Sequence, residues 1–408
     1  ETLAWRGRKL VGGRYLAVSS LMAIGVLVAS SLFFFLFPRL GIGFFFARSR
    51  ATQQVVGFSD EVEIGGFGRL KTSAEVVMRI EAADADLPPG PLRMRGLSFD
   101  NFDGRRWSRS DERTWILPLV ADNFVLPVRR EAVIPTDRTF SMKVYLEPLS
   151  TDVKVLFAPP RPRRVAFLDS RFDILRGRYK KAMLTTGGDL VYRAPPGTAL
   201  YYRVESVAAS DPVAERELLQ AASGEIPGRI RERWLQLPAD IDPRIAELAR
   251  TLVGAKAGLW AQAMALESAL QRLWTYSLEG DQDPEAPLAD FLFGARRGHC
   301  EYFATSMVLM MRSLGHPARL VNGFVGGDYN EIGGYLMIRQ GDAHSWVEVF
   351  FPGVGWRTFD PTPPSGQLAP AEDGVGMTLR RWVDGATMTW NKWVIEYDLE
   401  RQIDALKG

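Results

Sequence analysis

The chain has 408 residues and a net charge of +2 from 50 basic and 48 acidic residues. Because the charges balance and no segment forms a sustained basic stripe, the sequence does not suggest nucleic acid as a partner. The chain contains one cysteine, which excludes an intramolecular disulfide and a metal site built from several thiolates.

An uncharged, apolar run extends over residues 15–37 and ends before Pro38. A helix of this length spans roughly 34 Å at about 1.5 Å per residue, enough to cross a bilayer. A signal peptide has a shorter apolar core, whereas a buried core helix stays open as an alternative. The flanking basic residues place residues 1–14 in the cytoplasm by a small margin. The chain starts at Glu1 rather than Met, so we expect it to come from a longer gene product.

Short β-rich runs alternate with turn signals over residues 38–210. Alternating segments at 74–80, 140–146 and 201–206 are separated by Pro-Gly, Asp-Gly and Gly-Gly pairs. This pattern predicts an extracytoplasmic antiparallel β domain, which we expect to act as a scaffold or to guide substrate.

The periodicity becomes helical after residue 210, where we expect a catalytic core over 211–366. Helices are predicted at 213–222, at 243–253 with Asp242 as its cap, and at 261–278. A loop at 279–298 precedes a fourth helix that begins at Cys300 and stops at Gly315. Residues 367–408 are predicted to form a linker and a juxtamembrane helix.

Cys300 lies in the first turn of this fourth helix, which buries one stripe of apolar residues. Free cysteines are usually inert buried groups, but a helix N-terminus stabilises the thiolate. The position therefore favours a nucleophile. A zinc site made of Cys300, His299 and His344 lacks the spacing of any metal signature.

A β-hairpin is predicted to bring His344 and Asp360 together. His344 precedes a strand at 345–351, Asp360 follows a strand at 356–359, and a Pro-Gly turn joins them. With an even loop, Asp360 would oppose Val347 and face away from His344. With an odd offset or a bulge, Asp360 would oppose Trp346 or Glu348 and share the face of His344. A Cys–His–Asp triad therefore requires the odd offset.

Four segments in order resemble the transglutaminase-like core over about residues 270–364. They are Gly298–Ala304, Arg312–Arg319, Asp342–Val349 and Gly355–Thr362. Residues 95–107 and 390–398 are similar to the β region and the juxtamembrane helix of bacterial membrane-anchored transglutaminase-like proteins of the TgpA type. The resemblance implies an α+β fold with a transmembrane helix, an antiparallel β domain and a papain-like or transglutaminase-like core, in which the cysteine-bearing helix packs on an antiparallel sheet.

The resemblance also implies the chemistry. Cys300 would attack the side-chain amide of a protein or peptide glutamine, His344 would serve as acid and base, and Asp360 would orient the histidine. The acceptor would be a primary amine or water, with no cofactor and no metal. The oxyanion donors would be the Cys300 N–H and a side chain from Tyr276 or Trp274. The catalytic part would lie on the periplasmic side of the bacterial inner membrane.

Two other functions remain open from the sequence. A cysteine peptidase or amidase could use the same triad, and a non-catalytic membrane-anchored scaffold would need no triad at all. Three neighbouring residues are given lesser parts: His299 as a loop residue beside the nucleophile, Glu301 as a cap or partner of an arginine, and His316 as a structural residue at the helix end.

Overall fold

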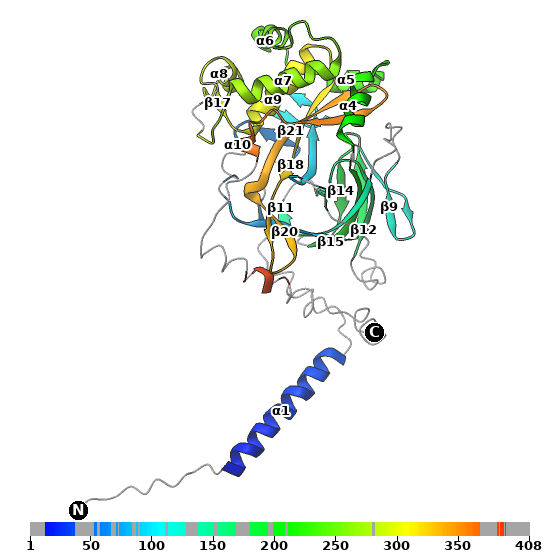
Figure 1. Ribbon diagram of the computed structural model, residues 1–408, viewed down its shortest axis with the longest axis vertical. Coiled ribbons are helices and arrows are strands. Elements are labelled where there is room, and N and C mark those ends of the chain that lie inside the picture. Colours follow the sequence, from blue (N-terminus) through cyan, green and yellow to red (C-terminus); the bar gives the residue numbers. More distant parts are fainter. Residues whose placement is uncertain are drawn as a thin grey trace, which may run out of the picture. The chain divides into compact units, whose positions relative to one another are not determined.

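The computed structural model describes residues 13–36, 53–54, 58–66, 71, 73–83, 87–88, 90–110, 113–127, 138–150, 154–168, 180–194, 199–208, 211–279, 282–367, 382, 384–386 and 388 (Figure 1). The chain divides into two compact units. One comprises Arg50–Gly385, and the other comprises the chain ends, Glu1–Ser49 and Ala386–Gly408. Most of the predicted segments at 1–14 and 367–408 lie outside the described residues.

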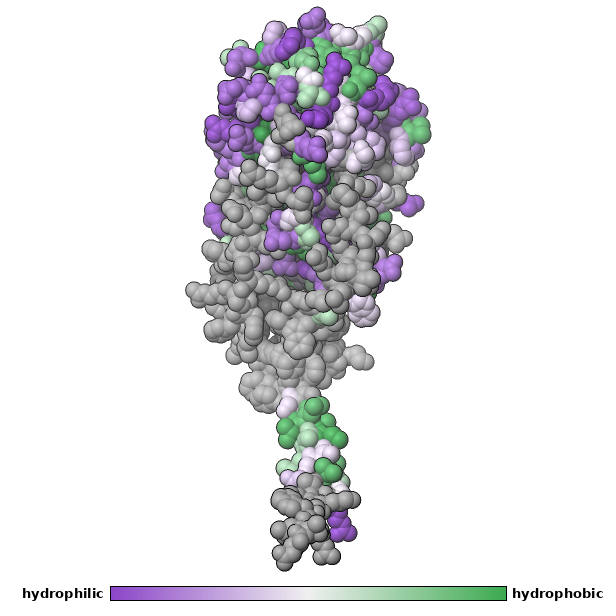
Figure 2. All heavy atoms as spheres, turned by 90° about the vertical axis from the view of Figure 1, so that its left-hand side faces the viewer, coloured by the Kyte–Doolittle hydropathy of each residue, from purple (hydrophilic) through white to green (hydrophobic). Residues whose placement is uncertain are grey.

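Helix α1, Gly13–Leu36, coincides with the predicted apolar span to within two residues. Its Gly13–Ser30 window has a mean hydropathy of 1.5, and none of that window is buried. Figure 2 shows its described surface as mainly hydrophobic. By length and composition, it is the one helix in the described part of the chain that could cross a membrane.

Six helices of the larger unit gather at one end of it (Figure 1): α4 Pro212–Ala221, α5 Gly228–Trp234, α6 Pro243–Val253, α7 Leu259–Leu273, α8 Pro287–Phe293 and α9 Cys300–Ser313. The unit also contains α10 Pro364–Gln367 and the 3₁₀ helix η2 Gln340–Asp342. The predicted helices at 213–222 and 243–253 are confirmed as α4 and α6. Their N-caps are Asp211 and Asp242, whose side chains accept first-turn backbone N–H groups.

One helix prediction and one loop prediction were wrong in detail. The helix predicted at 261–278 ends at Leu273, because Thr275–Tyr276 forms strand β16 and pairs with β17, Arg297–Gly298. The stretch predicted as a loop at 279–298 contains α8, a short helix with Pro287 in its first turn. Short helices of this kind carry too few residues for a periodic signal.

The strands form mainly antiparallel sheets, so the predicted α+β class is confirmed. The largest sheet contains, in order, β19 Asp328–Asn330, β20 Tyr335–Arg339, β3 Val76–Ala82, β10 Arg138–Leu146, β15 Leu200–Ala208, β12 Pro162–Phe167, β9 Asn123–Val125 and β8 Leu119–Val120. A four-stranded sheet contains β22 Gly355–Phe359, β21 Ala343–Phe351, β18 Ala318–Val325 and β4 Arg93–Phe99. Smaller sheets contain β14 Leu190–Arg193, β13 Lys181–Thr185 and β7 Thr114–Ile116, then β2 Glu61–Glu63, β6 Arg106–Ser108 and β5 Asn101–Phe102, and the parallel pair β1 Gln53–Gln54 and β11 Leu149–Ser150.

Both main sheets mix strands from the two sides of residue 210. Strand β3 pairs with β20, and β4 pairs with β18. At the second junction, a β-carbon on Gly323 would lie 2.3 Å from the carbonyl oxygen of Met94 and 2.5 Å from the Trp346 ring. Glycine therefore permits the close approach that brings the N-terminal β region against the later strands. The predicted boundaries at 38–210 and 211–366 remain a prediction, but the two regions share sheets.

Helix α9 packs on strands β18 and β21 and is covered by α6, α7 and α8. Every residue from Cys300 to Arg312 is buried, so the prediction of a single buried stripe was wrong. Two polar side chains on the helix have hydrogen-bond partners inside the protein: Trp107 donates to Thr305 at 2.9 Å, and Arg312 donates to the carbonyl oxygens of Ala318 and Asp100.

A buried ion network joins residues of the N-terminal β region to strands β18 and β21. Arg95 Nε lies 2.9 Å from Glu348 Oε1, and its Nη1 lies 2.7 Å from Asp189 Oδ1. Arg319 Nη2 lies 2.6 Å from Glu348 Oε2. Burial alone would raise the pKa of Glu348, but the two guanidinium groups lower it below its usual value. The carboxylate is therefore charged and holds two strands that flank the site.

Replacement of Glu348 by Gln should destabilise the larger unit by about 3–5 kcal/mol, because two buried guanidinium groups lose their counter-charge. Glu285→Gln is the matched control, since it breaks the exposed pair with Arg105 at 2.7 Å, which should cost less than about 1 kcal/mol. Denaturant unfolding of the full chain measures both. Equal unfolding midpoints for the two variants would contradict this account of the network.

Candidate active site

Cys300 is the first residue of α9, His344 is the second residue of β21, and Asp360 directly follows β22. In the hairpin, Val347 pairs with Phe359 and Phe351 pairs with Gly355. One further step along this register places Asp360 opposite Trp346, so the predicted odd offset is confirmed. His344 Nε2 lies 2.9 Å from Asp360 Oδ2.

The His344–Asp360 contact is a buried ion pair. Burial by itself would lower the pKa of His344, but the charges of Asp360 and Cys300 raise it to about 9. Burial would raise the pKa of Asp360, yet His344, and after it Arg93, hold that pKa below its usual value. The favoured state at neutral pH is therefore an imidazolium beside a carboxylate.

The thiol of Cys300 is fully buried. Burial by itself would raise its pKa, but the His344 imidazolium, followed by His299 and Lys71, lowers it well below the usual value. The helix N-terminus adds to this effect. His344 Nδ1 is buried, and no described residue other than Cys300 interacts with it as a hydrogen-bond partner. This nitrogen is therefore available to the thiol. The arrangement favours a thiolate–imidazolium pair.

His299 contributes more than its predicted position in a loop suggested. It is the N-cap residue of α9 and only 3% exposed, and its ring packs against Tyr302. Its Nδ1 lies 3.8 Å from Glu301 Oε2. Burial would lower the pKa of His299, but Cys300 and Glu301 raise it. Glu301 also accepts the backbone N–H of Gly65 at 2.9 Å.

Lys71 also acts on the nucleophile, although no local sequence signal marked it. Its side chain is 7% exposed, and its Nζ makes no hydrogen bond with a described residue. Its backbone lies against η2, where a β-carbon on Gly341 would be 3.2 Å from the Lys71 carbonyl oxygen. The N-terminal β region thus supplies a cation that lowers the pKa of Cys300.

The two predicted oxyanion donors differ in their surroundings. The indole N–H of Trp274 donates to the carbonyl oxygens of Phe291 and Leu292 at 3.1 and 3.3 Å, so it is already engaged. Tyr276 pairs with Gly298 in the β16–β17 ladder. Burial, and then the charge of Cys300, raise the pKa of Tyr276. Its hydroxyl therefore stays protonated near the thiol, as a donor must.

Four contacts besides the one with His344 fix Asp360. Its backbone N–H donates to Glu267 Oε1 at 2.7 Å, and its carbonyl oxygen accepts from Gln271 at 2.7 Å. The N–H of Thr362 donates to Oδ1 at 3.2 Å, and Arg93 Nη2 lies 3.3 Å from Oδ2. Arg93 comes from β4, in the region where the sequence offered no catalytic residue.

The third histidine lies apart from this group. His316 Nε2 is 2.7 Å from Gln262 Oε1 and ties the end of α9 to α7, in line with its predicted structural part. Among the described residues, no cluster of three or more His, Cys, Asp or Glu side chains is arranged to hold a metal ion.

Two family models match the chain. Residues 2–211 match the TgpA N-terminal domain, and residues 246–361 match the transglutaminase-like superfamily. The chain is 30% identical to a protein-glutamine gamma-glutamyltransferase of Pseudomonas aeruginosa, over 98% of this chain and 57% of that protein. It is 37% identical to the uncharacterized protein YebA of Bacillus subtilis, over 32% of this chain and 19% of that protein. The chain thus spans 57% of the length of the first relative and 19% of the length of the second.

Two crystal structures of the periplasmic domain of TgpA from Pseudomonas aeruginosa share the fold. The one bound to ethylmercury has a TM-score of 0.59 and 29% identity, and covers 77% of this chain and 98% of that chain. The other has a TM-score of 0.58 and 27% identity, and covers 85% of this chain and 100% of that chain.

The single cysteine allows a direct test of the charge state. The ultraviolet absorbance of the thiolate, taken as the difference between the wild type and Cys300→Ala, should persist at mildly acidic pH and disappear only as the pH falls through the lowered pKa of Cys300. In His344→Gln, the same absorbance should appear only at alkaline pH, because the cation that stabilises the thiolate is gone. His316→Gln is the matched control and should titrate like the wild type. A wild-type thiolate that forms only above the usual thiol pKa would contradict the ion pair.

Proposed function

Because the chain belongs to the TgpA family of transglutaminase-like proteins, we propose that it transfers acyl groups from glutamine side-chain amides through a Cys300 thioester. The observation that carries the proposal is the buried His344–Asp360 pair beside the single thiol. A thiolate that is held next to an imidazolium combines a nucleophile with the acid that its reaction needs.

In the first half-reaction, Cys300 Sγ attacks the amide carbonyl carbon and forms a tetrahedral oxyanion. His344 then gives its proton to the amide nitrogen as the C–N bond breaks and ammonia leaves. A thioester and a neutral imidazole remain. Asp360 holds Nε2, so that Nδ1 faces the reacting atoms, and it stabilises the imidazolium before and after transfer.

In the second half-reaction, neutral His344 accepts a proton from the acceptor as this attacks the thioester carbonyl carbon. A primary amine such as a lysine side chain gives an isopeptide bond, and water gives glutamate. The C–S bond breaks, and the thiolate–imidazolium pair returns. The same residues could cleave a peptide bond, so the nature of the leaving group distinguishes transfer and deamidation from the peptidase alternative.

Two donors are proposed for the oxyanion: the backbone N–H of Cys300 and the hydroxyl of Tyr276. What supports Tyr276 is its pairing beside Gly298 and its raised pKa near the thiol. Trp274 is set aside, because its N–H already serves two carbonyl oxygens.

The amine-transfer test uses a glutamine donor peptide and a labelled primary amine. The wild-type chain should incorporate the amine and release ammonia, and Cys300→Ala should do neither, because the thioester cannot form. Mass spectrometry of the donor peptide distinguishes the alternatives. Cleavage without incorporation would replace the transferase by a peptidase, and an unchanged donor would favour a non-catalytic scaffold.

Tyr276→Phe should lower kcat by about 10²–10³-fold with little change in KM, since the lost hydroxyl acts mainly in the transition state. The matched control is Tyr302→Phe, because the Tyr302 ring packs on Phe291 and His299 and its hydroxyl has no part in the proposed reaction. An equal decrease for both variants would show that Tyr276 acts through packing alone.

We also propose that α1 anchors the larger unit on the periplasmic face of the inner membrane. The support is its length and hydropathy and the fold shared with a periplasmic domain. Protease added to spheroplasts should then digest the larger unit while a cytoplasmic marker stays intact. Protection until the inner membrane is broken would contradict this orientation.

A further inference from the structure

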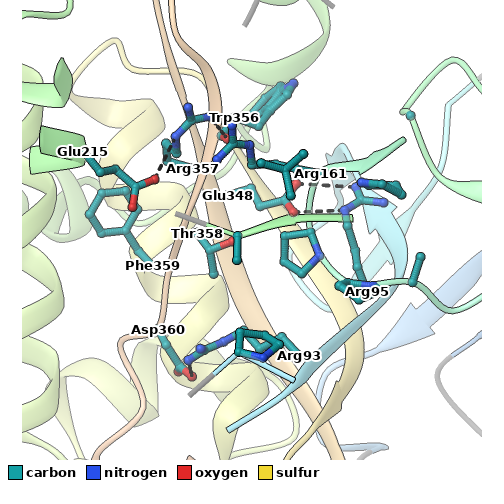
Figure 3. A pocket seen from close by; sticks show the side chains of 18 of the residues that line it. Arg93, Arg95, Arg161, Glu215, Glu348, Trp356, Arg357, Thr358, Phe359 and Asp360 are labelled. Carbon is teal, nitrogen blue, oxygen red and sulfur yellow. Dashed lines mark hydrogen bonds and ion pairs between the residues drawn. The ribbon is translucent and has the colours of Figure 1, made fainter. Parts of the chain in front are cut away.

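A cavity of about 750 Å³ lies on the Arg93 side of Asp360 (Figure 3). Both parts of the chain form it: Arg93 and Arg161 come from the N-terminal β region, and Trp356, Arg357 and Asp360 from the hairpin. Among the described residues, neither Cys300 nor His344 lines it. Its volume is typical of a small-molecule site.

The walls of this cavity combine apolar surface with excess positive charge. Leu126, Leu156, Leu219, Trp260 and Phe359 supply apolar surface. Seven arginines line the cavity against four carboxylates. One of those carboxylates, Glu267, has its pKa raised to about 7, first by burial and further by the charge of Asp360, so it is only partly charged at neutral pH. This composition fits an anion that carries an apolar body.

Most of the arginines that Figure 3 labels have carboxylate partners. Arg95 is paired with Glu348, and Arg357 Nε lies 3.3 Å from Glu215 Oε1. These ion pairs neutralise the arginines on one side of the cavity.

Arg93 also contacts a carboxylate, but it shares the carboxylate oxygen with His344 and has an N–H donor that no described residue uses. Its Nη2 lies 3.3 Å from Asp360 Oδ2, an oxygen that already accepts from His344 at 2.9 Å. Its Nε is buried and makes no hydrogen bond with a described residue. A guanidinium carries five N–H donors in a planar fork that matches a carboxylate or a phosphate. Arg93 therefore keeps donors for a ligand.

We propose that this cavity binds an amphipathic anion, a carboxylate or phosphate ester with an apolar body, through Arg93, and that the ligand draws Arg93 away from Asp360. Arg93 and His344 compete for one oxygen of Asp360. When an anion neutralises the guanidinium, that oxygen serves His344 alone, which strengthens the pair that orients the histidine. The cavity is thus a ligand site that is coupled, through Asp360, to the proposed general acid His344.

Binding is measured by calorimetry with hexyl phosphate as the probe, on the full chain in neutral detergent. The Cys300→Ala background makes the result independent of catalysis. Hexyl phosphate should bind more tightly than either hexanol or inorganic phosphate, because charge and apolar surface both contribute. Arg93→Met should weaken binding by about tenfold or more, through loss of charged hydrogen bonds, and Arg93→Lys should show an intermediate loss. Arg105→Met, an exposed site outside the cavity, should bind like the parent.

No saturable binding, or equal binding by Arg93→Met and Arg105→Met, would overturn the proposal. If Arg93→Met does not fold, the affinity of Arg93→Lys for hexyl phosphate is the test. An affinity equal to that of the parent would then contradict the role of Arg93 in binding. The coupling is measured in the chain with Cys300 intact: hexyl phosphate should shift the midpoint of the thiolate titration by more in the wild type than in Arg93→Lys. Bilayer nanodiscs identify the source of the anion. Weaker hexyl phosphate binding with anionic than with zwitterionic lipid would assign the site to a lipid headgroup, and equal binding would assign it to a soluble anion.

Discussion

The buried pair between His344 and Asp360 is the interaction on which the rest of the site depends. A charge that is removed from water must be matched by another, or the group becomes neutral. The thiolate of Cys300, the imidazolium of His344, the carboxylate of Asp360 and the guanidinium of Arg93 alternate in sign, and each stabilises its neighbour. This order requires an odd hairpin offset, the start of α9 beside β21, and β4 alongside β18.

The N-terminal β region is part of the site as well as its support. Strand β4 carries Arg93 to Asp360 and Arg95 to Glu348, and Lys71 adds a positive field at the thiol. The pairing of β4 with β18 places Arg93 and Arg95 for these contacts. A β region joined only by a linker could not hold cations within a few ångströms of buried carboxylates. The proposed anion site depends on the same junction, because its cavity takes walls from both parts.

Local features of the sequence predicted much of the fold and the site. The cap Asp242, the first-turn position of Cys300 and the alternation along the hairpin all depend on residues close in sequence. The parity of the hairpin was predicted as a condition, and the register meets it. Features set by distant contacts were missed. Helix α9 is buried on every side because α6, α7 and α8 cover the face that periodicity marked as exposed. Arg93 and Lys71 reach the site through strand pairing and packing that no local pattern encodes.

In the proposed mechanism, the Cys300 thiolate attacks an amide carbonyl carbon while His344 protonates the leaving nitrogen. Acid quenching of the chain with a glutamine peptide, in the absence of amine, followed by digestion and mass spectrometry, tests it most directly. This mechanism predicts one adduct, equal to the peptide minus ammonia, on the fragment that contains Cys300, and no adduct in His344→Gln. Ammonia release with Cys300 unmodified at every time point, or an adduct on another residue, would contradict it.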